Sequence, residues 1–374
     1  MKSGLERTIL EIKRRSRHDW EIFTGFYDRE RTFPELKQMG VTELKRVSVT
    51  RKYATVIRAG LTIATTRIDR PGIEAMLVCC DGLGSFINFA NPHLPSTCLC
   101  FTPLRAVYDP EYRARHLSRN RVARGIQSAV AAAYRRLDKR AWSHYRHVFC
   151  ISNEVKRRVL NGGLCGESRI EIAYPGIDAT MRSRSEQREA FFFLPGRIMW
   201  TKNIQLAIAA YRRFKARAGA GFALKIAGMV DEKSKRYHQQ LRELAGDDPS
   251  IEIVVDPTDA QMREYYRACY AVLLTAFNED LGITPIEAGA HGKPVIAVNR
   301  GGPREVVVHE QTGLLVEPEH EDFALALSRL ANDPALAARL GAANYERSSL
   351  YTWDPFVGAI DRYFDELATR PGDM

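Results

Sequence analysis

Two cations in the second half of the chain have types and spacing that suit a diphosphate. Gly196 and Arg197 follow an apolar run of Phe and Leu, and Lys202 stands where the next helical pattern opens. A helix N-terminus presents free N–H groups and a positive dipole end, so cations placed there would meet the same anion. Taken alone, however, such a pair of cations is more often a pair of solvated surface charges.

Two carboxylates, Glu279 and Glu287, enclose the glycine-containing segment EDLGITPIE, which follows an apolar run ending at Phe277. Carboxylates accept hydrogen bonds from vicinal hydroxyl groups such as those of sugars. A glycine turn between them would direct backbone N–H groups toward an anion at a helix N-terminus. The N–H groups concerned are those of Gly282, Ile283 and Thr284.

The same segment also has a purely structural reading. Thr284 as the helix N-cap, Pro285 at the first helical position and Glu287 three residues after the cap would form a capping box. Capping leaves the polar cluster at 278–280 unexplained, since it stands before the glycine turn. On these residues alone both readings remain open.

Two more glycine turns flank the next apolar run. Gly292 and Lys293 precede it, and Gly301 and Gly302 follow it at the entry to another helical pattern. Glycine lets the backbone approach a ligand closely, so three such turns at predicted strand ends favour an anionic ligand.

The elements that would position these residues alternate between strand and helix. Because the strand runs are continuously apolar rather than alternating, we expect mostly parallel sheets covered on both faces, in an α/β fold. Strands are predicted at 20–26, 46–50, 75–80, 96–101 and 147–151, then at 190–194, 222–227, 251–255, 271–275 and 294–298. Helices are predicted near 3–17, 52–67 and 113–145, then near 203–218, 231–245, 260–269, 285–291 and 320–331.

A chain of 374 residues exceeds the size at which one core keeps growing, so two domains are expected. We predict an N-terminal domain at 1–178 and a C-terminal domain at 179–350, both Rossmann-like. A terminal helix at 351–374 would cross back to the first domain. Two open α/β domains hold their ligand in the crevice at the carboxyl ends of their strands.

Residues 190–317 resemble the donor domain of family 4 glycosyltransferases. The matching segments are Gly-Arg-x4-Lys-Asn from 196, EDLGITPIE from 279, AxxxGKPVIA from 288 and GGPRE from 301, in the order and spacing of that family. Weaker similarity extends over the whole chain. The resemblance implies the GT-B fold, with two doubly wound domains facing each other across a cleft: an acceptor-side domain at 1–178 and a donor-binding domain at 179–350. It also implies transfer of a hexose of the glucose or mannose type with retention of configuration.

The resemblance also implies the roles of single residues. Arg197 and Lys202 would bind the donor diphosphate, Glu279 would contact the transferred sugar, and Glu287 would bind the nucleotide ribose. Of these, Arg197, Lys202 and Glu279 are the predicted catalytic residues. The co-substrate would be a UDP- or GDP-sugar and the acceptor a saccharide or a lipid-linked saccharide, as in cell-surface polysaccharide or glycolipid synthesis. No cofactor is expected, and no metal, because no Asp-x-Asp triplet occurs in the chain.

The N-terminal region departs from the family pattern. The family has a strand before the loop that corresponds to Gly4, yet few residues precede Gly4 here. We therefore expect the first strand to be missing from the middle of the sheet and its neighbours to lose apolar cover. Phe101 stands where related sequences often have His before Thr-Pro. Gly4 and Asp81 are the acceptor-side candidates, although Asp81 could equally be a strand-end cap.

Charge is spread unevenly along the chain. Residues 1–170 hold 31 Lys+Arg against 16 Asp+Glu, a net +15, while the remainder has a net −5. The basic helical segment 113–147 could be a solvated face, a surface that contacts anionic lipid, or a nucleic-acid site, but no nucleic-acid motif accompanies it. No apolar run is long enough to span a bilayer, so we expect a cytoplasmic protein, peripheral at the inner face of the membrane if the lipid reading holds.

Two other functions fit the same donor site. A GT-B sugar-nucleotide epimerase would bind the donor and use no acceptor, and a non-catalytic sugar-nucleotide-binding or membrane-scaffold protein would bind it without turnover. A Rossmann dehydrogenase is disfavoured, because no Gly-x-Gly-x-x-Gly follows a predicted strand.

Overall fold

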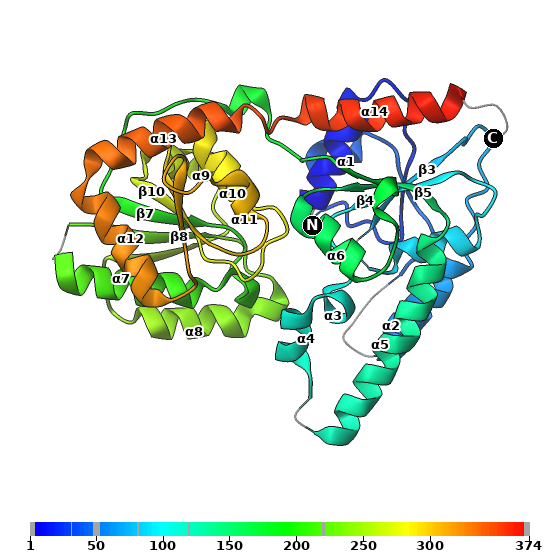
Figure 1. Cartoon of the computed structure of the whole chain (residues 1–374), viewed down its shortest axis with the longest axis horizontal. Helices are drawn as coiled ribbons and strands as arrows, with labels where there is room; N and C mark the ends of the chain where they lie inside the picture. Colours follow the sequence, from blue (N-terminus) through cyan, green and yellow to red (C-terminus); the bar gives the residue numbers. More distant parts are fainter. Residues whose placement is uncertain are drawn as a thin grey trace. The chain divides into compact units, whose positions relative to one another are not determined.

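The computed structural model describes residues 4–30, 32–47, 53–80, 82–118, 120–218 and 221–369. The chain divides into two compact units, shown in Figure 1. The first contains the chain up to Pro175 and the segment that starts at Asp354, and the second is Gly176–Trp353. These boundaries differ by three residues from the predicted 178 and 350.

The second unit contains one parallel sheet of six strands. In chain order within this unit the strands lie side by side as 3-2-1-4-5-6, the order of a Rossmann sheet. The order reverses between the first and the fourth strand. The strands are β7 (Phe191–Pro195), β8 (Ala223–Gly228), β9 (Ile251–Val255), β10 (Ala271–Leu274), β11 (Val295–Val298) and β12 (Gly313–Val316).

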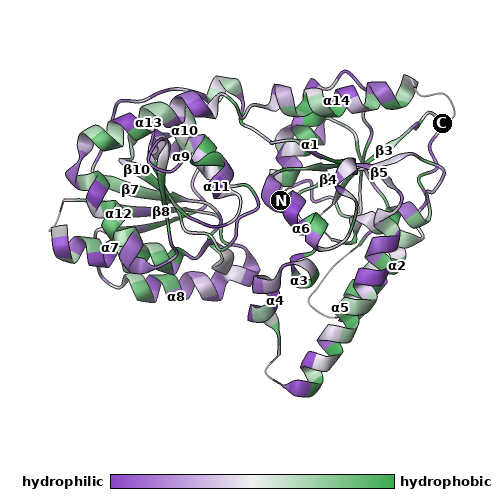
Figure 2. Ribbon diagram, in the orientation of Figure 1, coloured by the Kyte–Doolittle hydropathy of each residue, from purple (hydrophilic) through white to green (hydrophobic). Residues whose placement is uncertain are grey.

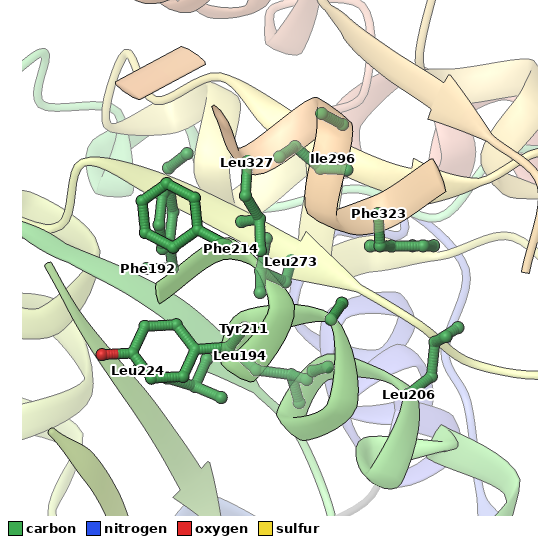
Figure 3. Packing of buried hydrophobic residues seen from close by; sticks show 14 of the residues in the cluster. Phe192, Leu194, Leu206, Tyr211, Phe214, Leu224, Leu273, Ile296, Phe323 and Leu327 are labelled. Atoms are coloured by element: carbon green, nitrogen blue, oxygen red, sulfur yellow. The ribbon is translucent and has the colours of Figure 1, made fainter. Parts of the chain in front are cut away.

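Helices cover both faces of this sheet. Phe192 and Leu194 of β7 point to one face, where α7 and α12 cover them (Figure 3), and Phe193 points to the other, where Tyr266 of α9 packs. Since alternate residues of one strand are buried on opposite faces, the strand is apolar throughout. The helices are α7 (Ile204–Ala218), α8 (Lys235–Ala245), α9 (Asp259–Ala268), α10 (Ile283–Ala290), α11 (Pro303–Val306), α12 (His320–Asn332) and α13 (Pro334–Ser348), with 3-10 turns η4 (Ala179–Met181), η5 (Trp200–Lys202) and η6 (Glu232–Ser234).

Within the described residues, the first unit contains two separate parallel sheets. One has two strands, β1 (Ile22–Thr24) and β2 (Val41–Glu43), and the other has four in chain order, β3 (Met76–Cys80), β4 (Ser96–Cys100), β5 (Tyr145–Cys150) and β6 (Ile170–Ile172). Its helices are α1 (Gly4–Arg15), α2 (Tyr53–Ala64), α3 (Arg105–Tyr108), α4 (Pro110–His116), α5 (Arg121–Trp142), α6 (Asn153–Asn161) and α14 (Trp353–Thr369), with η1 (Pro34–Lys37), η2 (Leu83–Phe89) and η3 (Glu167–Arg169).

A cavity of about 1030 Å³ lies between the two sheets of the first unit. Ile22 and Phe23 of β1 border it on one side, and Leu77 and Val78 of β3 border it on the other. Within the described part of the chain, β1 pairs only with β2 and β3 only with β4. The sheet is thus split at the place where the family resemblance puts a central strand, and apolar side chains of both strands line the gap.

Several elements differ from those predicted. The single helix expected at 113–145 is two helices, because Leu117 is extended and the Asn120 side chain accepts from the N–H groups of Val122 and Ala123, which starts α5. The strand predicted at 46–50 lies partly outside the described residues, and β2 precedes it in the chain. The prediction omitted β6, β12, α6 and α13.

Candidate functional site

The predicted donor-side residues gather at the carboxyl ends of β7 and β10. These strands are neighbours, with Phe193 opposite Val272, and they are the pair at which the strand order reverses. Beyond β7 the chain passes through Arg197, and beyond β10 it reaches Glu279. Open α/β sheets bind their ligands at this topological switch point, so the residues that follow both strands form the candidate site.

Lys202 and Glu279 form an ion pair at this site. The Nζ of Lys202 donates to Oε2 of Glu279 at 2.7 Å, and about a fifth of each side chain is exposed. Two contacts hold the loops that carry them: the N–H of Phe277 donates to the carbonyl of Thr201 at 2.9 Å, and the Thr275 hydroxyl donates to the carbonyl of Lys202 at 2.8 Å. The two residues are therefore fixed together although they are 77 positions apart.

Arg197 lies on the turn that follows β7 and is exposed. Within the described residues its guanidinium has no hydrogen-bond or ion-pair partner. The turn is fixed by a close approach, because a Cβ on Gly228 would lie 1.8 Å from the carbonyl oxygen of Gly196. The fold thus holds this turn in place, and the guanidinium of Arg197 is available to an anionic ligand.

Helix α10 begins beside this pair, two residues earlier than the capping-box reading predicted. Gly282 occupies the N-cap with φ of 88°, a left-handed conformation that favours glycine, and Ile283 is the first helical residue. Thr284 is the second residue of the helix and is buried. The predicted N-cap at Thr284 and its capping box with Glu287 are wrong. The first-turn N–H groups of a helix have no partner within it, so they and the helix dipole favour an anion here.

Glu287 has a specific partner that no motif indicated. The hydroxyl of Tyr266, on α9, donates to Oε2 of Glu287 at 2.5 Å. Burial raises the pKa of Glu287, while the Tyr266 hydrogen bond and the charge of Lys202 act to lower it. One carboxylate oxygen is thereby used within the protein. Tyr266 stands in an ordinary apolar helix face, so no sequence signal singles it out.

The glycine pair at 301–302 has a packing role. The N–H of Gly302 donates to the carbonyl of Glu279 at 2.9 Å. A Cβ on Gly302 would lie 2.3 Å from Cα of Leu281, and one on Gly301 would lie 2.6 Å from the carbonyl oxygen of Glu279. The GGPRE segment therefore packs against the loop that carries Glu279 and helps to fix its position.

The acceptor-side candidates belong to the first unit. Gly4 is the first residue of α1 and is exposed, with open space where a Cβ would stand. Asp81 lies outside the described residues. Phe101 follows β4 and is half-buried. In the part of the chain that the structure describes, no cluster of three or more His, Cys, Asp or Glu side chains is placed to hold a metal ion.

Comparison with known families identifies the unit that carries this site. Residues 178–347 match the family model described as glycosyl transferases group 1. The matched segment contains Arg197, Lys202, Glu279 and Glu287. The second unit belongs to the glycosyl transferases group 1 family. The predicted family relationship is confirmed at this level.

Curated relatives match this chain over part of their length. It is 31% identical over 192 residues to alpha-1,3/1,6-mannosyltransferase ALG2 of Dictyostelium discoideum, covering 47% of this chain and 46% of that protein. It is 28% identical over 282 residues to a D-inositol 3-phosphate glycosyltransferase of Pseudarthrobacter chlorophenolicus, covering 69% and 62%. The chain thus spans about half the length of the curated relatives it matches.

Solved structures resemble both units. Anabaena HepE, crystallised in complex with UDP and glucose, has a TM-score of 0.71 at 17% identity, covering 98% of this chain and 96% of HepE. A glycosyltransferase from Rickettsia africae has a TM-score of 0.73 at 16% identity with the same coverage. At such identities the likeness shows the fold alone, and it confirms the predicted GT-B fold.

Proposed function

We propose that the protein is a retaining glycosyltransferase that moves a hexose of the glucose or mannose type from a UDP- or GDP-sugar to an acceptor hydroxyl. One observation carries the proposal: the Lys202–Glu279 pair and the unpaired Arg197 stand together at the switch point of a Rossmann sheet. Cations beside a carboxylate at a helix N-terminus match a ligand in which a diphosphate adjoins a sugar.

Each group has a distinct role in this proposal. The leaving diphosphate gains charge in the transition state, so Arg197, Lys202 and the first N–H groups of α10 stabilise it. Glu279 accepts hydrogen bonds from the sugar hydroxyls and orients Lys202 through their ion pair. Glu287 binds the ribose hydroxyls with the carboxylate oxygen that Tyr266 leaves free.

The relatives support a nucleotide-sugar donor. ALG2 is named as a mannosyltransferase and the inositol phosphate enzyme as a glycosyltransferase, and HepE was crystallised with UDP and glucose. We propose a saccharide or lipid-linked acceptor, as in cell-surface polysaccharide or glycolipid synthesis. Front-face displacement, with the donor phosphate deprotonating the acceptor, needs neither an enzymic nucleophile nor a metal.

A donor screen tests the function. Purified protein is incubated with UDP-glucose, UDP-galactose and GDP-mannose, with and without a panel of saccharide acceptors. Released nucleotide is measured, and NMR gives the anomeric configuration of any product. We expect transfer or slow hydrolysis with one donor and an axial product from an axial donor. Inversion would contradict retention, and an epimerised donor formed without acceptor would identify an epimerase instead.

Substitution of the two glutamates should separate their roles. Glu287→Ala is expected to weaken binding of the free nucleoside diphosphate, since loss of hydrogen bonds to a charged group costs about 1.5–3 kcal/mol, roughly ten- to a hundredfold in Kd. Glu279→Gln is expected to lower turnover and leave that Kd nearly unchanged, because its partner is the sugar. Calorimetry and initial rates measure both. Equal losses of nucleotide affinity in the two variants would contradict this division.

Tyr266→Phe should change the pH dependence of nucleotide binding. The Tyr266 hydrogen bond lowers the pKa of Glu287, so its removal raises that pKa further above the ordinary value. The carboxylate form accepts hydrogen bonds from the ribose more strongly than the neutral acid does, because its oxygens are charged. As pH falls, affinity of the variant should therefore drop at a higher pH than that of the unmodified protein. Calorimetry across pH measures the shift, with Tyr265→Phe as the matched control, and identical profiles would contradict the ribose role.

We also propose that the protein works at the inner face of the membrane. No helix among the described residues is long and apolar enough to span a bilayer. A lipid-linked acceptor presents its saccharide at the bilayer surface, so contact would be peripheral.

A further inference from the structure

Helix α5 exposes a row of large apolar side chains. Val122 is 72% exposed, Ile126 55% and Leu137 51%, and Val130 completes the row. At 3.6 residues per turn these positions fall along one side of the helix over about four turns. Figure 2 shows green and purple segments side by side on α5. An apolar row of this length left in water indicates a surface that contacts something else.

The exposed part of α5 also carries basic side chains, of which Arg136 and Arg140 lie nearest to this row around the helix. Within the described residues Arg121, Arg124, Arg136 and Arg140 have no carboxylate partner. Asp138 is the one acidic residue of α5, and it is buried, accepting hydrogen bonds from Ser85 and Tyr108. The exposed part of α5 is therefore apolar and cationic, without any carboxylate.

Helix α2 also exposes apolar side chains and contains no acidic residue, and like α5 it packs on η2. Gly60 of α2 lies against Phe86 of η2, and Tyr134 of α5 packs on the same Phe86 with ring centroids 5.8 Å apart. Leu61 of α2 is 63% exposed, and α2 contains no acidic residue. The two helices thus pack on the same residue of η2, and both expose large apolar side chains.

We propose that the outer faces of α5 and α2 form a docking surface for an anionic lipid bilayer. A bilayer offers the two partners that this surface requires: negative headgroups for the arginines and hydrocarbon for the valine, isoleucine and leucine side chains. A nucleic acid offers phosphates but no apolar counterpart to the row. A second copy of the chain would bring arginines against arginines. The inference rests on the proposed function in one respect: the surface would bring the first unit to a lipid-linked acceptor.

The test is flotation of the full chain with vesicles. One set contains 30% phosphatidylglycerol in phosphatidylcholine and the other phosphatidylcholine alone, each at low and high salt. Arg136→Gln with Arg140→Gln removes two flanking charges, and Val122→Ser with Ile126→Ser removes two apolar residues of the row. Matched controls on the second unit are Arg236→Gln with Arg263→Gln, and Leu325→Ser, all at exposed positions.

We expect binding to anionic vesicles that weakens with salt, and little binding to neutral vesicles. At about 1 kcal/mol per basic residue, the double arginine variant should bind roughly 25-fold more weakly. The double serine variant should lose binding to a similar degree, and both control variants should bind like the unmodified chain. Equal weakening by the control arginine variant would overturn the inference, since net charge alone would then explain binding. Equal weakening by Leu325→Ser would overturn it too, since any exposed apolar residue would then suffice. Binding to RNA in place of vesicles would also overturn it.

Activity separates this inference from the function itself. Turnover with a soluble donor and acceptor, measured without vesicles, should be unchanged in the α5 variants because they are remote from Lys202 and Glu279 in the sequence and lie in the other unit. Turnover without vesicle binding would refute the docking surface and leave the function intact. Vesicle binding without turnover of any donor would refute the proposed function and leave the docking surface intact.

Discussion

Replacing Arg197 or Lys202 with alanine is expected to reduce turnover by about tenfold to a hundredfold, as loss of a group that stabilises a developing charge does at such sites. Arg197 is exposed and unpaired within the described residues, so its removal should leave the melting temperature unchanged while turnover falls. Lys202→Ala also removes the partner of Glu279, 2.7 Å away, and should have the larger effect. Initial rates at saturating donor measure both.

Arg213→Ala is the matched control for this prediction, since Arg213 is an exposed arginine of α7 that pairs with Glu321. It should keep full turnover. EDTA should have little effect on the unmodified protein, because protein cations take the place of a metal at the diphosphate. A strict requirement for added magnesium or manganese would contradict that assignment, as would full activity of either site variant.

Gly302→Ala is expected to lower both stability and turnover. The new Cβ would lie 2.3 Å from Cα of Leu281 and 2.5 Å from the carbonyl oxygen of Asp280, both backbone atoms that cannot rotate away. Forcing such a group into a packed site costs about 1–3 kcal/mol. The loop that moves to relieve the contact carries Glu279, and misplacement of a catalytic group by about 1 Å costs on the order of a hundredfold in rate.

Thermal unfolding and initial rates test this prediction together. Gly221→Ala is the control, because a Cβ at Gly221 would meet nothing within 4 Å. It should match the unmodified protein in both measurements. Normal turnover in Gly302→Ala would show that the 301–302 turn does not set the position of Glu279.

The main site residues were predictable because the ends of strands can be inferred from apolar runs. Arg197 and Glu279 each follow such a run, and parallel strands bring their carboxyl ends to one edge. The ion pair between Lys202 and Glu279 was not predictable, since it depends on the loop contacts of Thr275 and Phe277. Both contacts end on backbone carbonyl groups, and only the Thr275 hydroxyl is a side-chain group, so they carry little residue-specific signal.

The start of α10 was mispredicted for a related reason. Threonine is a strong N-cap and Pro285 a common first residue, so local preference favoured a cap at Thr284. Tertiary packing prevails instead: Gly282 takes a left-handed turn, Thr284 is buried, and Glu287 bonds with Tyr266 of another helix. Local sequence rules describe a helix end in water, whereas this one is embedded in the unit.

Because the sheet of the first unit is split, we expect strands of the two units to open at different free energies. A pair of three-residue strands is marginal by itself, and β1 and β2 are joined to no third strand within the described chain. Their amides should exchange with deuterium through local fluctuations at a small fraction of the global unfolding free energy. Amides of β7 and β10, central in six strands, should exchange only when the whole second unit unfolds. The strands that position the candidate site would then stay closed, while β1 and β2 beside the cavity open and close.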